Sequence, residues 1–279
     1  MINATPKTAK TFYKSKTIGA GNNAKTIKGD GESGYVTAIL YLKPFKSIFD
    51  GKAFNTCPNA GIAGCATACL YSAGRGRMSN VQAGRTNKTE WFYKNRTDFL
   101  ATLANDIARF IRKAEKDGLT PCIRLNGTSD IRFESIPVDY DGVTYDSIFA
   151  AFPDVQFYDY TKLANRKNIP SNYNLTFSYS EANPAYKPMI ERAMANGLNI
   201  AVVFRDESHI PEEFWGLPVV NGDKDDLRFL DQSKANGGIQ SIVALYAKGQ
   251  AKTDHSGFVI NTHWTLKKGF HMKIKQANT

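Results

Sequence analysis

Short apolar segments that alternate with helical or turn-forming segments set the strongest limit on the fold of this 279-residue chain. Strand-like runs, rich in β-branched and aromatic residues, fall at 36–42, 122–126, 155–160, 175–179, 199–204, 217–220 and 239–246. Helical patterns fall at 97–118, 145–152 and 186–196. Strands separated by helices or short connections pair in parallel. The sequence therefore predicts an α/β fold, a full or partial β/α (TIM-like) barrel of about six to eight mostly parallel strands, with an open doubly wound sheet as the alternative.

The longest predicted helix begins at Thr97, which is a favourable residue for a helix N-cap, and ends at Gly118. Phe99, Leu103 and Ile107 recur every fourth residue, so one face of this helix is apolar. We expect that face to pack against the sheet.

Two segments before this helix lack the same regularity. Residues 1–34 are rich in Lys and Gly and predict a basic flexible arm, which leaves residues 35–279 as a single barrel-like domain. A loop with three cysteines and a basic Gly/Arg stretch then extend to about residue 95. No G-x-G-x-x-G motif follows a predicted strand, which argues against a dinucleotide-binding domain.

The chain is strongly basic, with 36 Lys and Arg residues against 26 Asp and Glu residues and a net charge of +10. One cluster of basic residues follows the cysteines and consists of Arg75, Arg77, Arg85, Lys88, Lys94 and Arg96. Such a cluster favours a polyanionic partner, a nucleic acid or a nucleotide, through the release of counterions. The alternative is a solvated basic surface with no partner.

The chain contains no apolar run of about 18 residues, so we expect no membrane span. Its first residues, Met1 to Lys7, lack the apolar stretch of a secretory signal. These features predict a cytoplasmic protein. In that reducing compartment, cysteines serve metal binding or catalysis more often than disulfides.

Three of the four cysteines, Cys57, Cys65 and Cys69, lie within one short segment, with the spacing C-x7-C-x3-C. The intervening residues are small, so the backbone can fold tightly around a shared metal centre. Three thiolates suit a [4Fe–4S] cluster with one open iron. Zinc is the alternative, although paired C-x-x-C knuckles are missing. Buried packing of free thiols is the third interpretation, and the most natural one for Cys122 in the second strand.

Polar residues follow the predicted strands, where a β/α barrel carries its chemistry. They are Asn126, Ser129 and Asp130 after the second strand, Tyr160 and Lys162 at the third, Ser178 at the fourth, Arg205 at the fifth, Asp223 at the sixth and Lys248 at the seventh. Because turns also favour such residues, each position alone has a structural explanation.

Charged residues inside or beside apolar strands need partners of opposite charge. Arg124 lies within the second strand, and an acidic group of Asp223, Asp225 and Asp226 follows the sixth, close to Arg228. These acids could pair with the buried cations, or bind a ribose, a cation or a substrate amine. Three acids can also hold Mg²⁺ for phosphodiester hydrolysis, which makes a metal-dependent nuclease a lesser alternative.

The segment Cys57-Pro-Asn-Ala, with Cys65-Ala-Thr-Ala-Cys69-Leu-Tyr after it, resembles the N-terminal motif of phage-encoded radical-SAM-like proteins. Arg124-Leu-Asn-Gly-Thr-Ser-Asp130 and Tyr158-Asp-Tyr-Thr-Lys162 also resemble segments of that family. The likeness covers roughly residues 35–250. The usual radical-SAM spacing is C-x3-C-x2-C, and this chain departs from it.

The resemblance implies a partial β/α barrel with a cluster loop after the first strand, a [4Fe–4S] cluster and S-adenosylmethionine as cofactors, and the cytoplasm of a bacterial host. Cys57, Cys65 and Cys69 would be the cluster ligands. The residues that would line the pocket are Asn126, Ser129, Asp130, Tyr160 and Lys162.

Our hypothesis is an iron–sulfur protein similar to radical-SAM enzymes that acts on a nucleotide or nucleic acid. The expected catalytic residues are Lys162, Asp130 and Asp223. The expected cofactor-binding residues are Asn126, Ser129, Tyr160, Ser178 and Arg205. The expected substrate-binding residues are Arg124, Asp225, Asp226, Arg228 and Lys248. The alternative is a non-enzymatic protein that binds nucleic acid or a host factor and has structural cysteines.

Overall fold

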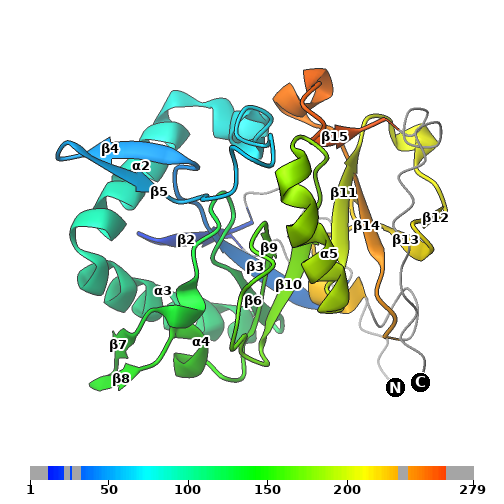
Figure 1. The fold of residues 1–279 in the computed structure, drawn as a ribbon. Coiled ribbons are helices and arrows are strands. Elements are labelled where there is room, and N and C mark those ends of the chain that lie inside the picture. Colours follow the sequence, from blue (N-terminus) through cyan, green and yellow to red (C-terminus); the bar gives the residue numbers. More distant parts are fainter. Residues whose placement is uncertain (1–11, 22–25, 27–32, 232–237, 262–279) are drawn as a thin grey trace, which may run out of the picture.

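The computed structural model describes residues 12–21, 26, 33–231 and 238–261, and its centre is an 11-stranded sheet (Figure 1). The order is β1-β2-β3-β6-β9-β10-β11-β14-β13-β12, with β15 beside β11. These strands are β1 (Tyr13–Lys14), β2 (Ile18–Ala20), β3 (Tyr35–Leu40), β6 (Thr120–Arg124), β9 (Gln156–Thr161), β10 (Tyr173–Ser178), β11 (Ile200–Phe204), β12 (Glu213–Phe214), β13 (Leu217–Asn221), β14 (Ile242–Tyr246) and β15 (Val259–Ile260).

The strands from β3 to β13 along this order all pair in parallel, whereas β1, β2 and β12 pair antiparallel at the two ends. The carboxyl ends of the parallel strands therefore share one edge of the sheet. The order of the strands follows the chain from β1 to β11, and the next three strands stand in reverse order as β14, β13 and β12. A doubly wound sheet instead extends in both directions from its first strand. Closure into a full or partial barrel stays a prediction.

The helices and the smaller hairpins lie outside this sheet (Figure 1). The helices are α2 (Ser79–Lys94), α3 (Arg96–Lys116), α4 (Ile148–Ala151) and α5 (Lys187–Ala195). The hairpins are β4 (Lys46–Phe49) with β5 (Lys52–Asn55) and β7 (Val138–Tyr140) with β8 (Val143–Tyr145). The 3-10 turns are η1 (Leu70–Ser72), η2 (Gly74–Arg77), η3 (Phe133–Ser135), η4 (Pro184–Tyr186), η5 (Glu207–His209), η6 (Arg228–Leu230) and η7 (Gly249–Thr253).

Helix α3 packs against the sheet through the apolar face that the sequence predicts. Phe99, Leu103 and Ile107 are completely buried in one core with Ile123 of β6 and Phe157 of β9. Full burial of such a side chain stabilises the fold by about 1.5–3 kcal/mol. The helix ends where Gly118 adopts a φ of 72°, close to the predicted end. A second apolar cluster, under α5, covers β10 and β11.

Part of the segment predicted as a flexible arm joins the sheet as β1 and β2. Both the backbone N–H and the hydroxyl of Thr17 donate to the buried carboxylate of Asp106 on α3, at 3.0 and 2.6 Å. The Tyr13 hydroxyl donates to the Asp106 carbonyl at 2.9 Å. The other residues of this segment fall largely outside the described part, and the division at residue 34 stays a prediction.

Helix α2 lies in the basic stretch that the sequence pattern leaves without a helix. Its sequence has a weak apolar periodicity, and its buried residues are only Arg85, Thr89 and Phe92. Phe92 packs against the rings of Phe54 and Phe99, at centroid distances of 6.1 and 5.3 Å. Tertiary contacts of this kind override a weak local preference.

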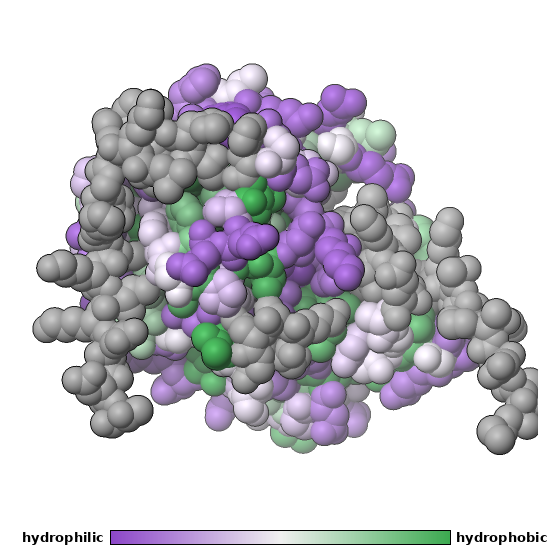
Figure 2. Space-filling model, turned by 90° about the vertical axis from the view of Figure 1, so that its right-hand side faces the viewer, coloured by the Kyte–Doolittle hydropathy of each residue, from purple (hydrophilic) through white to green (hydrophobic). Residues whose placement is uncertain are grey.

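Figure 2 shows the face on the right-hand side of Figure 1, where hydrophilic and hydrophobic residues alternate over short distances. Among the described residues, no helix is long and apolar enough to cross a membrane.

One face of the sheet carries a buried ion pair between Arg124 of β6 and Asp226, whose side chains are 9% and 3% exposed. The segment that contains Asp226 and Leu227 covers this face, and Leu227 packs with Cys122 and Tyr158. Attraction offsets the desolvation of such a pair only while both charges are present.

We expect Asp226→Ala to lower the free energy of unfolding by about 3–5 kcal/mol, because Arg124 would remain buried without this carboxylate. Urea denaturation followed by circular dichroism measures the loss. Lys187→Ala is the matched control, since it breaks an exposed i,i+4 pair with Glu191 and should cost less than about 1 kcal/mol. Equal losses in the two variants would contradict this account of the buried pair.

Candidate functional site

The segment from Cys57 to Cys69, here called the cysteine loop, lies across the carboxyl ends of neighbouring parallel strands, in the upper middle of Figure 1. Three hydrogen bonds fasten it and the residue before it to successive strand ends: Asp130 N–H to Thr56 O at 2.7 Å, Asn59 Nδ2 to Lys162 O at 2.8 Å, and Ser180 Oγ to Ala63 O at 2.7 Å. The loop is therefore built into the sheet edge after β6, β9 and β10.

The three thiols of the loop form no disulfide bonds and are half-buried. The Cys57 thiol donates to the Thr128 carbonyl at 3.5 Å, and the Cys69 sulfur accepts from the Tyr71 N–H at 3.5 Å. Cys69 is close enough to both Cys57 and Cys65 for their charges to interact. The structure thus brings the three predicted ligands into one group.

Burial makes these thiols hard to ionise. It raises the pKa of Cys57 from its ordinary value of 9.0 to about 12 and is also the largest cause of the raised pKa values of Cys65 and Cys69. The thiols are therefore protonated at neutral pH in the metal-free protein. A bound metal lowers thiol pKa values, so its binding would release protons from this group.

Lys162 presents a positive charge to the three thiols. Its charge interacts with Cys65, Cys57 and Cys69, and burial lowers the pKa of Lys162. The ammonium group donates to the Ser178 hydroxyl at 3.0 Å and lies 4.8 Å from the centre of the Phe258 ring. Two residues predicted from strand ends, Lys162 and Ser178, are thereby joined beside the cysteine loop.

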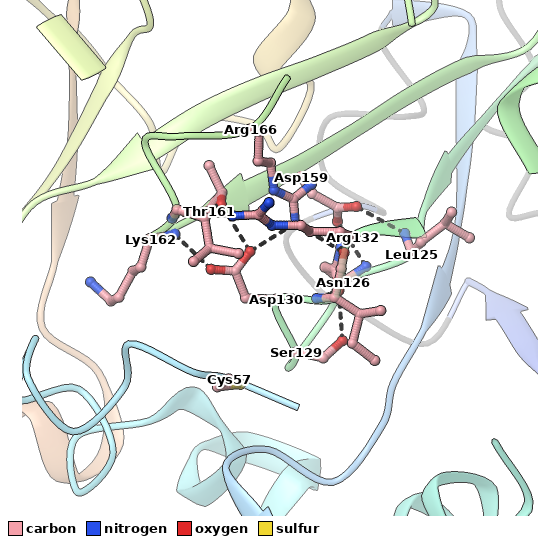
Figure 3. Close-up of polar contacts among 12 residues, drawn as sticks. Cys57, Leu125, Asn126, Ser129, Asp130, Arg132, Asp159, Thr161, Lys162 and Arg166 are labelled. Atoms are coloured by element: carbon pink, nitrogen blue, oxygen red, sulfur yellow. Dashed lines mark hydrogen bonds and ion pairs between the residues drawn. The ribbon is translucent and has the colours of Figure 1, made fainter. Parts of the chain in front are cut away.

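The carboxylate of Asp130 holds this edge together (Figure 3). One oxygen accepts from the Thr161 hydroxyl at 2.8 Å and from Arg166 Nη2 at 3.0 Å, and the other accepts from the Lys162 N–H at 2.8 Å. The Lys162 side chain points away from this carboxylate (Figure 3). Asp130 therefore positions Lys162. The hydrogen bonds that its carboxylate accepts come from Thr161, Lys162 and Arg166.

Asn126 and Ser129 shape the loop before Asp130. The Asn126 side-chain oxygen accepts from the Ser129 hydroxyl and from the Ile131 N–H, both at 2.8 Å. Buried Asp159 accepts from the N–H groups of Leu125 and Asn126, at 3.1 and 3.0 Å (Figure 3). Burial raises the pKa of Asp159 to about 6.

A second group of predicted residues gathers on the sheet face covered by η6. Arg228 is 1% exposed and contacts Asp225, and Arg124 pairs with Asp226. The Arg124 guanidinium also lies 5.3 Å from the centre of the Tyr160 ring. Of these five residues, predicted for substrate or cofactor binding, four form two ion pairs, and the fifth, Tyr160, places its ring beside Arg124.

Arg205, Asp223 and Lys248 lie at the ends of β11, β13 and β14. Arg205 donates to the carbonyls of Ala251 and Lys252, at 3.2 and 2.7 Å, and so holds η7 against the sheet. Asp223 forms an ion pair with Lys248 and accepts from a backbone N–H at 2.9 Å. These contacts join neighbouring strand ends, and functional roles for the three residues stay predictions.

The sequence pattern places Asp159 and Thr161 at the end of the third predicted strand but assigns them no role, and it does not indicate Arg166 or the part that Arg85 plays beside Cys69. Arg166 is 8% exposed and reaches Asp130 from the β9–β10 connection. The sequence signal for Asp159 is its position between two aromatic residues of a strand. A carboxylate buried there needs hydrogen-bond donors.

No three His, Cys, Asp or Glu side chains in the described ranges stand where they could bind one metal ion together. The acids considered for a magnesium site pair with different cations: Asp223 with Lys248, Asp225 with Arg228 and Asp226 with Arg124. A four-iron cluster differs from a single ion because each thiolate binds a different iron, which requires a wider spacing of the sulfurs.

Comparison with known proteins places the chain in a family. Residues 13–262 match the family model described as Gene product 88, and the chain belongs to this phage-type family. The match covers the whole sheet and the cysteine loop. No curated protein and no solved structure matches the chain.

Gly64 allows the close approach of the cysteine loop to the C-terminal part of the sheet. It adopts a φ of 66°, and a Cβ atom there would lie 2.6 Å from both Ala182 Cβ and Ser256 Oγ. At Gly61 of the same loop, a Cβ atom would meet only the Phe45 ring, at 3.9 Å. The two glycines therefore form a matched pair for testing how the loop is held.

We expect Gly64→Ala to displace the loop and to raise the rate at which iodoacetamide alkylates Cys65 in the metal-free protein. The reason is that exposure lowers a thiol pKa that burial holds high, and only the thiolate reacts. Peptide mapping by mass spectrometry measures the rate at pH 8. In the Gly61→Ala variant, iodoacetamide should alkylate Cys65 at the wild-type rate. Unchanged reactivity in Gly64→Ala would show that the tight approach does not hold the loop.

Proposed function

We propose that the chain is an iron–sulfur protein in which Cys57, Cys65 and Cys69 hold a [4Fe–4S] cluster with one open iron. S-adenosylmethionine is the proposed second cofactor, in keeping with the resemblance to radical-SAM-like proteins. The observation that carries the proposal is the grouping of three half-buried thiols around one ammonium group at the carboxyl edge of parallel strands.

The donor set fits such a cluster better than it fits one zinc ion. Three thiolates leave a fourth iron without a protein ligand, whereas structural zinc takes four ligands. Cys122 is completely buried against Tyr158 and Leu227, so it is not part of the loop group. Binding of the cluster would remove the protons of the three thiols and leave negatively charged thiolates. The positive charge of Lys162 would offset part of this negative charge.

When bound and reduced, the cluster would supply the electron that cleaves S-adenosylmethionine. The chain's own residues would orient the ligands: Lys162 faces the thiols, Ser178 fixes its ammonium group, and Asp130 fixes its backbone. The neighbouring face with Arg124, Tyr160 and Arg228 would hold the substrate. Buried ion pairs keep these groups in place without rearrangement, which favours preorganised binding.

A non-enzymatic protein with structural cysteines is the second candidate. The observation in its favour is that Arg75 and Arg77 lie exposed beside the cysteine loop and could contact a nucleic acid directly. Zinc would then be the metal to expect, and it would need a fourth ligand from outside the three thiols.

Anaerobic reconstitution of the full chain with iron and sulfide tests the first proposal. We expect about four irons and four sulfides per chain, with a brown colour that bleaches on reduction. Cys57→Ser, Cys65→Ser and Cys69→Ser should each lose most of the iron, whereas Cys122→Ser should keep it, because Cys122 lies outside the loop.

A colourless, iron-free wild-type protein after reconstitution would overturn the iron–sulfur proposal. One zinc per chain in the same preparation, lost in the three loop variants, would support the second candidate. Equal iron content in all four variants would mean that the iron is bound elsewhere.

A further inference from the structure

Arg85 of α2 places a buried positive charge next to the cysteine loop. Its side chain is 8% exposed, and its charge interacts with the thiol of Cys69. Burial lowers the pKa of this guanidinium, which means that its charged form is held in an unfavourable place. The proposed function assigns no role to Arg85.

The surroundings of Arg85 leave two of its N–H groups without partners. The guanidinium lies 4.6 Å from the centre of the Tyr41 ring and 5.3 Å from that of Tyr71. Nε and Nη1 are buried, and neither forms a hydrogen bond. The groups that act on its charge are two phenols and the Cys69 thiol, with no carboxylate among the described residues. A buried cation normally has a partner of opposite charge.

Lys88 adds a second cation on the same side of α2. Its ammonium group donates to the Thr17 carbonyl at 3.1 Å, which is an uncharged partner. Burial and, as the smaller cause, the charge of Arg85 together lower the pKa of Lys88 to about 8. The two neighbouring cations therefore repel each other.

The turns η1 and η2 cover the Arg85 side chain of this pair. A Cβ atom on Gly76 would lie 3.4 Å from Arg85 Nη1, so the backbone of η2 passes directly over the guanidinium. Arg75 and Arg77 lie exposed on the same turn. These exposed basic residues would attract an anion toward Arg85.

We propose that Arg85, with Lys88 behind it, binds a phosphate group of the molecule that reaches the cysteine site. Phosphate suits the pair better than a carboxylate because it carries up to two negative charges, and a guanidinium contacts it with two parallel N–H groups. The inference that this phosphate belongs to a substrate rests on the proposed function. The inference that Arg85 and Lys88 bind phosphate does not rest on it.

Isothermal titration calorimetry on the metal-free full chain tests the site with three probes: inorganic phosphate, adenosine 5′-monophosphate and a short 5′-phosphorylated oligonucleotide. We expect the phosphorylated probes to bind, and unphosphorylated adenosine to bind at least about tenfold more weakly. Arg85→Gln should lower the affinity for phosphate by about ten- to a hundredfold, because it removes charged hydrogen bonds.

Arg112→Gln is the matched control, since it removes the same charge from an exposed position on α3 and should bind like wild type. Arg85→Lys keeps the charge without the planar fork and should show an intermediate loss. This variant also keeps the test decisive if Arg85→Gln does not fold.

Absence of phosphate binding in wild type, or equal affinity in Arg85→Lys and wild type, would overturn the proposal. Tighter binding of the mononucleotide would assign the site to free nucleotides, and tighter binding of the oligonucleotide would assign it to nucleic-acid ends. Because the protein carries no metal in this experiment, its outcome is independent of the iron analysis.

Discussion

The carboxylate of Asp130 is the contact on which the candidate site depends. It accepts hydrogen bonds from Thr161, Lys162 and Arg166, while its own backbone N–H donates to the residue before Cys57. One residue thus joins three parts of the site: its side chain links the end of β6 to the end of β9, and its backbone N–H holds the start of the cysteine loop. Without it, the parallel strands would still end at one edge, but the thiols and the ammonium group of Lys162 would not be held together.

Two zones of charge meet at this edge, and they differ in character. Around the thiols, the cations Lys162 and Arg85 stand beside the acids Asp130 and Asp254, and these two cations suit centres and ligands that bring negative charge. On the face under η6, Arg124 and Arg228 are paired with carboxylates, which suits a neutral polar group. A substrate with a phosphate at one end and uncharged polar groups at the other would match both zones.

The sequence predicted much of the fold because periodicity is a local signal: the apolar face of α3 follows from it, as do the strands β3, β6, β9, β10, β11, β13 and β14. It did not predict α2, whose burial depends on contacts of Phe92 with residues distant in sequence. The cysteine grouping was visible from spacing. The surroundings of Arg85 were not, because only the three-dimensional packing shows that no carboxylate of the described residues acts on its charge. The same holds for Asp130, whose three donors come from a different strand and loop.

The central claim is that the three thiols hold a cluster with one iron left open for a ligand. The most direct test is a Mössbauer spectrum of the full chain reconstituted anaerobically with ⁵⁷Fe, recorded before and after addition of S-adenosylmethionine. The account predicts four irons per cluster, one of which changes its isomer shift when the ligand is added. Four irons that do not respond to S-adenosylmethionine, or a sample without a cluster, would contradict it.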